Sequence, residues 1–255
     1  MKKKIKAYLF RLLGEEKYLK LLNRGFFFMY RTGLLKSDEG YKYHYFVKQL
    51  IKKGDTVVDI GANLGYFTKL YSEWVGDNGK VIAIEPVPLY NKIIKWTCRG
   101  RKNITLYPYA LGKENKKVHL VTPDHFGYLR TGLPHIYDEK ANKPLSEYEF
   151  SFEAEMKKAD DLFASFEKID YLKCDIEGYE EVVIPEILLT LQKFKPIIQI
   201  ETWGTHKPIV EAALNGAGFE KYYLNGTELK KAVAGEEDPP GDLIFIHNSR
   251  TEIVK

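Results

Sequence analysis

The chain contains few cysteines and no long apolar run. Cys98 and Cys174 are its only cysteines, and they stand far apart and outside any spacing typical of metal ligands. This excludes a disulfide framework as the basis of the fold and favours a reducing, cytoplasmic compartment. No stretch of about 18 uninterrupted apolar residues occurs, so we expect no helix that spans a membrane.

A strong excess of one charge is also missing. The 39 Lys and Arg residues nearly balance the 35 Asp and Glu residues, which leaves a net charge of +4. This balance argues against a dedicated nucleic-acid binder, so we expect no nucleic-acid partner. The basic excess is concentrated at the beginning of the chain, where the first 20 residues hold seven Lys or Arg and two Glu.

The basic beginning of the chain, residues 1–36, also predicts an amphipathic helix. Its first apolar residues fall on one helical face: Ile5, Leu9, Leu12 and Leu13. The favoured role is packing on the core, where the helix would cover the sheet edge. The alternative is peripheral docking on a membrane surface or a partner. With a second helix expected at 41–51, residues 1–52 form a predicted N-terminal helical extension.

From residue 53 onwards, predicted strands alternate with helices. Apolar, β-branched runs typical of buried parallel strands occur at 56–60, 80–86, 103–108, 169–178 and 195–203. Helices are expected at 66–75, 89–99, 159–166 and 207–217. Two last strands, 220–225 and 242–248, are expected to form an antiparallel hairpin at the sheet edge. We therefore predict that residues 53–255 form an α/β domain with a mainly parallel seven-stranded sheet and helices on both faces.

An insertion at about 113–158 interrupts this alternation. Two strands, at 118–123 and 149–156, are predicted to flank a polar and aromatic stretch. Residues of this stretch that could contact a polar ligand are His125, Tyr128 and His135. Ordinary loop packing is the favoured interpretation of any one of them, and binding of a polyol acceptor by the insertion is the functional alternative.

A glycine turn follows the first strand directly. The segment Asp59-Ile-Gly-Ala-Asn-Leu-Gly65 joins a buried strand to a helix, which is where open α/β sheets bind ligands. Gly61 permits a tight turn, and Gly65 permits close approach of a ligand. Glu85 ends the next strand, 20 residues after Gly65, where a carboxylate can accept both ribose hydroxyls of an adenosine ligand.

The same segment helps to choose between adenosine cofactors. A dinucleotide needs G-x-G-x-x-G for its pyrophosphate, but Ala62 and Asn63 stand where the second glycine is wanted. The Asp59 carboxylate would repel a pyrophosphate and attract the cationic sulfonium of S-adenosyl-L-methionine. We therefore predict S-adenosyl-L-methionine as the cofactor, with an NAD-dependent oxidoreductase as the alternative. A non-catalytic, membrane-associated cofactor-binding protein is a further alternative.

Four motifs resemble the FkbM family of methyltransferases over roughly Gly54 to Trp203: D-I-G-A-N-L-G-Y-F-T, I-E-P, Y-A-L-G and K-C-D-I-E-G-Y-E. The last, D-x-E-G-x-E, is the most specific. The resemblance implies a class I, Rossmann-like methyltransferase fold and O-methylation, often of hydroxyls on sugars or natural products. It implies cofactor contacts, in the order of the chain, by Asp59, Gly61, Ala62, Asn63, Gly65, Glu85, Pro86, Ala110 and Asp175. Cys174 departs from the family pattern, and residues 121–150 match nothing in it, which leaves the acceptor undefined.

The catalytic residues are expected at the tips of the fourth and fifth strands. A hydroxyl is a weak nucleophile and normally needs a general base. The candidates are Asp175, Glu177, Glu201 and His206. Glu177 could instead favour a helix N-terminus, and His206 could be a solvated loop residue. No His/Asp/Glu spacing demands a metal, so none is expected. The predicted partner is a small-molecule or glycan acceptor.

Overall fold

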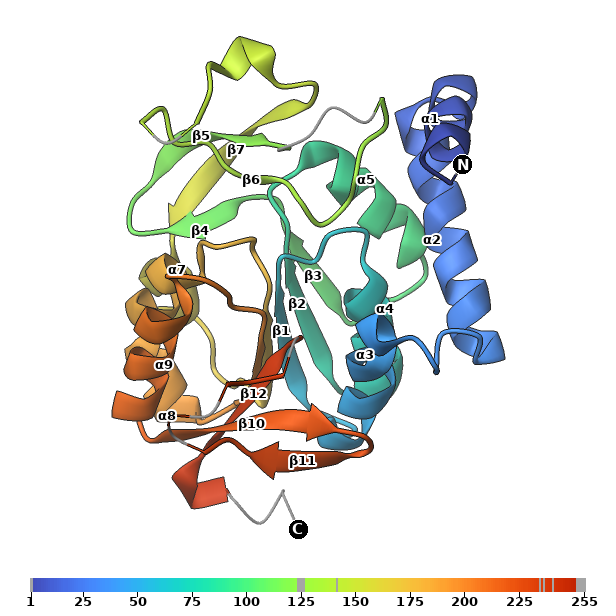
Figure 1. Cartoon of the computed structure of the whole chain (residues 1–255). Helices are drawn as coiled ribbons and strands as arrows, with labels where there is room; N and C mark the ends of the chain where they lie inside the picture. The colour runs from blue at the N-terminus through green and yellow to red at the C-terminus, as the bar shows by residue number, and fades with distance from the viewer. Residues whose placement is uncertain are drawn as a thin grey trace.

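The computed structural model describes residues 2–122, 127–140, 142–233, 235, 237–239 and 241–250. His125, a predicted acceptor contact, lies outside the described residues. Within these residues no helix is both long enough and apolar enough to cross a bilayer. Figure 1 shows a main sheet with helices on both sides and a smaller sheet above one end of it.

The main sheet has eight strands among the described residues, in the order β11-β10-β12-β9-β8-β1-β2-β3. Their bounds are β1 (Thr56–Ile60), β2 (Lys80–Ile84), β3 (Ile104–Tyr107), β8 (Tyr171–Cys174), β9 (Ile197–Ile200), β10 (Phe219–Asn225), β11 (Glu228–Lys231) and β12 (Leu243–His247). The five strands from β3 to β9 are parallel, and β12 runs antiparallel to both β9 and β10. The expected α/β fold with a mainly parallel sheet is therefore confirmed.

The edge of this sheet differs from the prediction. The two last predicted strands, now β10 and β12, are antiparallel neighbours, but β12 lies inside the sheet. The edge hairpin is formed by β10 and β11, which meet at a two-residue loop beginning with Gly226. The predicted count of seven strands is wrong because this glycine lets a polar segment turn back and pair with β10.

Helices cover both faces of the main sheet, as predicted (Figure 1). The bounds on one face are α3 (Lys42–Phe46), α4 (Tyr66–Val75) and α5 (Pro88–Thr97), and on the other α6 (Ala159–Ala164), α7 (Glu180–Glu186), α8 (Leu188–Phe194) and α9 (Lys207–Gly216). Strand residues alternate between the two cores: Val57 packs with α3 and α4, whereas Val58 packs with α6 to α9. Short 3-10 helices are η1 (Glu39–Tyr41), η2 (Val47–Leu50) and η3 (Leu145–Glu147).

The N-terminal segment forms two helices instead of the single expected one. They are α1 (Lys2–Leu13) and α2 (Glu15–Thr32), and the chain bends between them at Gly14, which has φ 71°. α2 buries residues such as Leu19 and Phe26 and packs mainly against α4 and α5. Asn23 of α2 also donates a hydrogen bond to the carbonyl oxygen of Leu64 (2.9 Å), which ties α2 to the glycine turn.

The insertion forms a second sheet of four strands in the described part of the chain. The order is β4-β7-β5-β6, with bounds β4 (Ala110–Gly112), β5 (Lys116–Val121), β6 (His135–Ile136) and β7 (Ser151–Lys158). The strands β5 and β7 were expected, whereas β4 and β6 were not. In Figure 1 this sheet lies above the carboxyl ends of the parallel strands of the main sheet.

Candidate active site

A cavity lies between the carboxyl ends of the main-sheet strands and the second sheet. Its empty space, the open mouth included, is about 650 Å³. Predicted site residues in its wall are Gly61, Asn63, Glu85, Pro86, Ala110, Asp175 and Glu177. The other predicted residues do not line it: Asp59, Ala62, Gly65, Glu201 and His206.

The glycine turn brings the ends of β1 and β8 together. Gly61 has φ 81°, and a Cβ atom there would lie only 1.8 Å from the carbonyl oxygen of Asp175. The Gly61 amide donates to the carbonyl oxygen of Ile84 at 2.9 Å, so the turn is also attached to the end of β2. No other residue type fits this position without movement of the backbone.

Glu85 is a buried carboxylate at the end of β2. Its Oε1 accepts a hydrogen bond from the Val87 amide (2.8 Å), and its Oε2 accepts one from the Asn63 amide (2.8 Å). Burial raises the pKa of Glu85 to about 8. Each carboxylate oxygen keeps a further acceptor site, so Glu85 can still accept hydroxyl groups from a ligand in the cavity.

Asn63 and Gly65 shape the loop between β1 and α4. Asn63 has φ 52°, and its side-chain oxygen is buried without a hydrogen-bond partner among the described residues. Gly65 has φ 77° and precedes the first residue of α4; a Cβ there would meet Ile94 at 3.3 Å. Gly65 therefore serves the close packing of the loop on α5, whereas Asn63 faces the cavity.

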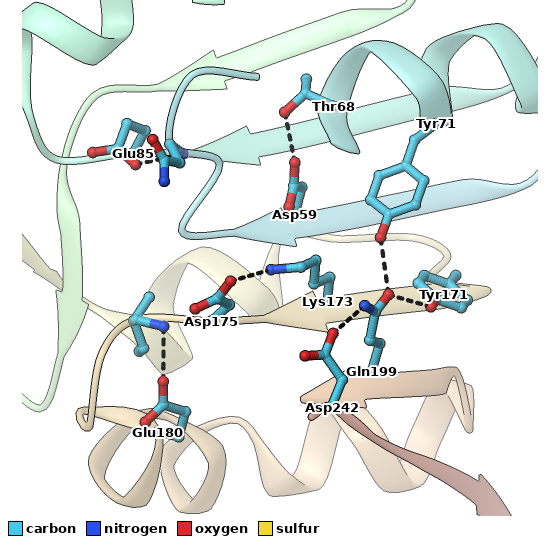
Figure 2. A network of polar contacts seen from close by, with 12 residues as sticks. Asp59, Thr68, Tyr71, Glu85, Tyr171, Lys173, Asp175, Glu180, Gln199 and Asp242 are labelled. Atoms are coloured by element: carbon cyan, nitrogen blue, oxygen red, sulfur yellow. Dashed lines mark hydrogen bonds and ion pairs between the residues drawn. The ribbon is translucent and has the colours of Figure 1, made fainter. Parts of the chain in front are cut away.

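Asp59 lies on the α4 side of the sheet, behind the cavity wall. Its side chain is fully buried, and Oδ2 accepts a hydrogen bond from the Thr68 hydroxyl of α4 (2.6 Å; Figure 2). Burial raises the pKa of Asp59, against the opposing effect of the positive charge of Lys173. Asp59 therefore has a structural partner, and its predicted contact with the cofactor stays a prediction.

A row of buried polar residues crosses three neighbouring strands behind the site. Asp59 of β1, Lys173 of β8 and Gln199 of β9 are register partners and lie on the same face of the sheet. The Gln199 oxygen accepts hydrogen bonds from the hydroxyls of Tyr171 (2.6 Å) and Tyr71 (3.2 Å), and its amide donates to Asp242 (Figure 2). The sequence signal for this row was the lysine in the middle of a buried strand.

Lys173 holds Asp175 at the rear of the cavity. Its Nζ lies 2.7 Å from Oδ2 of Asp175, and its side chain is buried. Burial alone would lower the pKa of Lys173, but the carboxylates around it, Asp175 first, outweigh this effect and raise the pKa. The charged lysine thus supplies a counter-charge for the Asp175 carboxylate, which directly follows β8.

The predicted strand 169–178 ends early, at Cys174, because the next residues turn. The carboxylate of Glu180 accepts the amide of Ile176 (2.7 Å) and that of Gly178 (2.9 Å), which closes the loop. Glu177 has φ 57° at the tip of this loop and lines the cavity. Burial and the nearby negative charges, Asp175 first, raise the pKa of Glu177 to about 7.

Glu201 and His206 lie beside this loop but outside the cavity wall. Partial desolvation and the charges of Asp175 and other carboxylates raise the pKa of Glu201, although much of the residue is exposed. His206 Nδ1 lies 2.9 Å from Oε1 of Glu181, and its ring meets that of Trp203 edge-on. Their predicted catalytic roles stay predictions, and the geometry favours Glu177 over both.

The insertion supplies the wall opposite these carboxylates. Further wall residues include Tyr109, Leu111 and Tyr179 within the quoted motifs, and Tyr90, Leu120, Pro134 and Ile136 outside them. Of the predicted acceptor contacts, His135 lines the cavity, whereas Tyr128 is buried against Tyr18 of α2. Tyr90 of α5 and Leu120 of β5 fit the apolar pattern of their own elements, and that pattern does not show that they also line a cavity.

The cavity wall fits an adenosine-bearing cofactor. Asn63 and Tyr90 line it, and the side-chain oxygen of each is buried without a hydrogen-bond partner among the described residues. Glu85 offers acceptors for ribose hydroxyls, and Ala110 leaves room beside apolar side chains for a base. No group of three or more His, Cys, Asp or Glu residues in the described ranges is arranged to hold a metal ion.

Comparisons with known proteins agree with this architecture. The methyltransferase FkbM domain matches residues 59–227. The FkbM methyltransferase of Methylobacillus flagellatus KT is similar in structure, with a TM-score of 0.51 and 14% identity, over 94% of this chain and 52% of that one. The present chain thus spans about half the length of that protein. At 14% identity, this structural similarity is evidence for a shared fold alone.

Two further structures are more distant. An S-adenosylmethionine-dependent O-methyltransferase from Thermotoga maritima has a TM-score of 0.45 and 16% identity, over 80% of this chain and 63% of that one. Aeropyrum pernix fibrillarin, in complex with S-adenosyl-L-methionine, has a TM-score of 0.42 and 13% identity, over 76% and 67%. No curated protein matches the sequence. Because the FkbM domain covers more than half of its residues, the chain belongs to the FkbM family of methyltransferases, for which S-adenosyl-L-methionine is the methyl donor.

Proposed function

We propose that this methyltransferase transfers a methyl group to a hydroxyl oxygen, and that the acceptor is a sugar or glycan. The observation that carries the proposal is the position of Glu177. Its carboxyl group lines the same cavity as Glu85 and has a pKa raised to about 7. A general base with a pKa near the working pH is what methylation of a weak hydroxyl nucleophile needs.

The residues of the glycine turn and of β2 would hold the nucleoside. Glu85 would accept the ribose hydroxyls, while Gly61 and Asn63 shape the adjacent wall. S-Adenosyl-L-methionine supplies, when bound, a methyl group made electrophilic by the positive sulfonium. The carboxylates Asp175 and Glu177 give this end of the cavity a negative charge that favours a cation.

Glu177 would take the proton of the acceptor hydroxyl as the new oxygen–carbon bond forms and the bond between the methyl group and the donor sulfur breaks, with S-adenosylhomocysteine as the leaving group. Lys173 holds Asp175 by an ion pair, and burial together with the nearby Asp175 raises the pKa of Glu177. The cavity also excludes part of the solvent, which favours proton transfer within the site. The cavity walls would further raise the rate of methyl transfer by positioning the acceptor hydroxyl.

The cavity wall supports a polyol acceptor. His135, Tyr109 and Tyr179 place polar and aromatic groups around the cavity, next to apolar residues of β5 and β6. Aromatic rings bind the apolar faces of sugar rings, and the polar groups bind hydroxyls.

The test is direct methylation by the purified protein. The protein is incubated with S-adenosyl-L-methionine and separate pools of monosaccharides, oligosaccharides, simple alcohols and amines, and each pool is analysed by mass spectrometry. The proposal expects a sugar pool to gain one methyl group in place of a hydroxyl hydrogen, and to lose that product with Glu177→Gln. Methylation of the amine pool alone would contradict it.

A further inference from the structure

α1 carries apolar residues both where it packs on the core and on its exposed side, so the apolar face expected for Ile5, Leu9, Leu12 and Leu13 is only partly buried. Leu9 and Leu13 pack inward against the core. Ile5, Tyr8 and Leu12, spaced i, i+3 and i+7, point outward and are 52%, 66% and 65% exposed. A helix with a second apolar stripe on its exposed side usually lies against another surface.

The charge of α1 has a single sign. The helix contains Lys and Arg residues, among them Lys4, Lys6 and Arg11, and no acidic residue. An exposed apolar stripe with basic residues along it is the pattern of helices that lie in the interface of an anionic bilayer. In Figure 1, α1 and α2 lie together along one side of the molecule, so the second helix extends the same region.

A groove between α2, α4 and α5 collects further cations. Its lining includes Arg24, Arg31, Lys69 and Arg99. The guanidinium groups of Arg24 and Arg99 lie 5.1 and 5.2 Å from the centre of the Trp96 ring, and Lys69 Nζ lies 4.7 Å from that of Phe27. Aromatic rings thus hold these cations beside the groove.

Only one of these four cations, Arg31, pairs with a carboxylate among the described residues. Glu73 is paired with Arg101 (3.0 Å) and with Arg31 (3.4 Å). In contrast, Arg24, Lys69 and Arg99 form no salt bridge with any described residue. Three cations at one groove without a carboxylate favour an anionic ligand.

Two other features of the groove point to the kind of anion. Thr97 lies in its wall, is 4% exposed and has a hydroxyl without a hydrogen-bond partner among the described residues. Phe28, also in the lining, is 65% exposed. A hydroxyl donor beside Arg and Lys suits a phosphate, and an exposed phenyl ring beside that phosphate suits an acyl chain.

We propose that α1 and α2 dock this protein on an anionic phospholipid bilayer, with a lipid phosphate in the groove of Arg24, Lys69 and Arg99. The bilayer is the occupant that matches both features, because it offers phosphates to the cations and hydrocarbon to Phe28 and the α1 stripe. A nucleic acid would match the cations and leave the apolar residues in water. The proposal concerns a surface separate from the cavity and does not depend on the proposed function.

Vesicle sedimentation with the full chain tests the proposal. Vesicles of phosphatidylcholine alone are compared with vesicles that contain an equal part of phosphatidylglycerol. We expect association with the mixed vesicles only, weakened by salt. The groove variant Arg24→Gln, Lys69→Gln, Arg99→Gln should bind them about a hundredfold more weakly, since each cation near the surface contributes about fivefold.

Two further variants separate the causes. The control Lys113→Gln, Lys193→Gln, Lys230→Gln removes the same charge from exposed positions outside α1, α2 and the groove, and it should bind like the wild type. The stripe variant Ile5→Ser, Tyr8→Ser, Leu12→Ser keeps every charge and should bind at least about tenfold more weakly. Thermal melting and binding of S-adenosylhomocysteine verify that each variant is folded.

Four results would overturn the proposal. The first is no association of the wild type with mixed vesicles, and the second is an equal loss in the groove variant and the control. The third is tighter binding to a single-stranded oligonucleotide than to mixed vesicles. The fourth is groove-dependent binding of inorganic phosphate in calorimetry without vesicle association, which would assign the groove to a soluble anion.

Discussion

The backbone of Gly61 lies so close to that of Asp175 that residue 61 has no space for a side chain. A Cβ at residue 61 would lie 1.8 Å from the Asp175 carbonyl oxygen and 2.9 Å from its carbonyl carbon. The glycine turn after β1 and the D-I-E-G loop after β8 are therefore one structural unit. Through it, the nucleoside end of the cavity and the carboxylates of the proposed catalytic end keep a fixed relation.

Gly61→Ala should abolish binding of S-adenosylhomocysteine and destabilise the protein. Gly76→Ala is the matched control, since Gly76 also has a positive φ (69°) but no atom within 4 Å of its Cβ position. The control should lose only the roughly 1–3 kcal/mol of backbone strain at a positive φ, whereas Gly61→Ala adds a collision with backbone. Urea denaturation and calorimetry measure both effects. Equal losses in the two variants would mean that contact with Asp175 is unimportant.

Binding of the cofactor should be linked to the titration of Glu85. Burial raises its pKa to about 8 from 4.5, so the free protein loses stability as pH rises through this range. Ribose hydroxyls donate to the carboxylate form, so affinity for S-adenosylhomocysteine should increase as pH rises towards 8 with release of a proton. Calorimetry in buffers of different ionisation enthalpy measures that release. Glu85→Gln should abolish it and cost at least about tenfold in affinity; an affinity independent of pH would contradict this role.

The rate of methylation should depend on the protonation of Glu177. Its pKa of about 7 predicts that kcat rises with pH through neutrality, as the carboxylate form becomes populated. Glu177→Gln should lower kcat about 10²- to 10⁴-fold and leave binding of S-adenosylhomocysteine intact. Glu201→Gln removes the same charge from the next strand end, outside the cavity wall, and should have a small effect. A larger loss with Glu201→Gln would transfer the role of base to that residue.

Lys173 should be essential for stability rather than for chemistry. It is buried and paired with Asp175 at 2.7 Å, so Lys173→Met leaves carboxylates without a counter-charge. We expect a loss of about 3–5 kcal/mol in the free energy of unfolding. Lys168→Met breaks a comparable pair with Asp170 (2.9 Å) at the surface and should cost less than about 1 kcal/mol. Denaturant titration measures both; similar values would show that the buried pair contributes little.

The sequence predicted best those parts of the fold that repeat a period. Helix α4 occupies the predicted range 66–75, because Gly65 and Gly76 bound an apolar helical pattern. The short strands β4 and β6 have three and two residues and show no period, so they were missed. The bend at Gly14 was missed because the apolar pattern continues across it.

The sequence correctly predicted the site residues whose position is set by a local turn. It predicted less well those whose position depends on contacts with residues distant in the chain. Gly61, Asn63 and Glu85 face the cavity because the turn after β1 and the end of β2 place them there. Asp59 belongs to the same motif, but the alternation of the strand turns its side chain towards Thr68. The end of β8 depends on hydrogen bonds accepted by Glu180, which no periodic pattern records.

The most direct test of the account is calorimetry of the purified protein with S-adenosylhomocysteine and with NAD, each against wild type and Glu85→Gln. The account predicts binding of S-adenosylhomocysteine by the wild type, weakened by Glu85→Gln, and no binding of NAD. A folded protein that ignores S-adenosylhomocysteine, or that binds NAD more tightly, would contradict it.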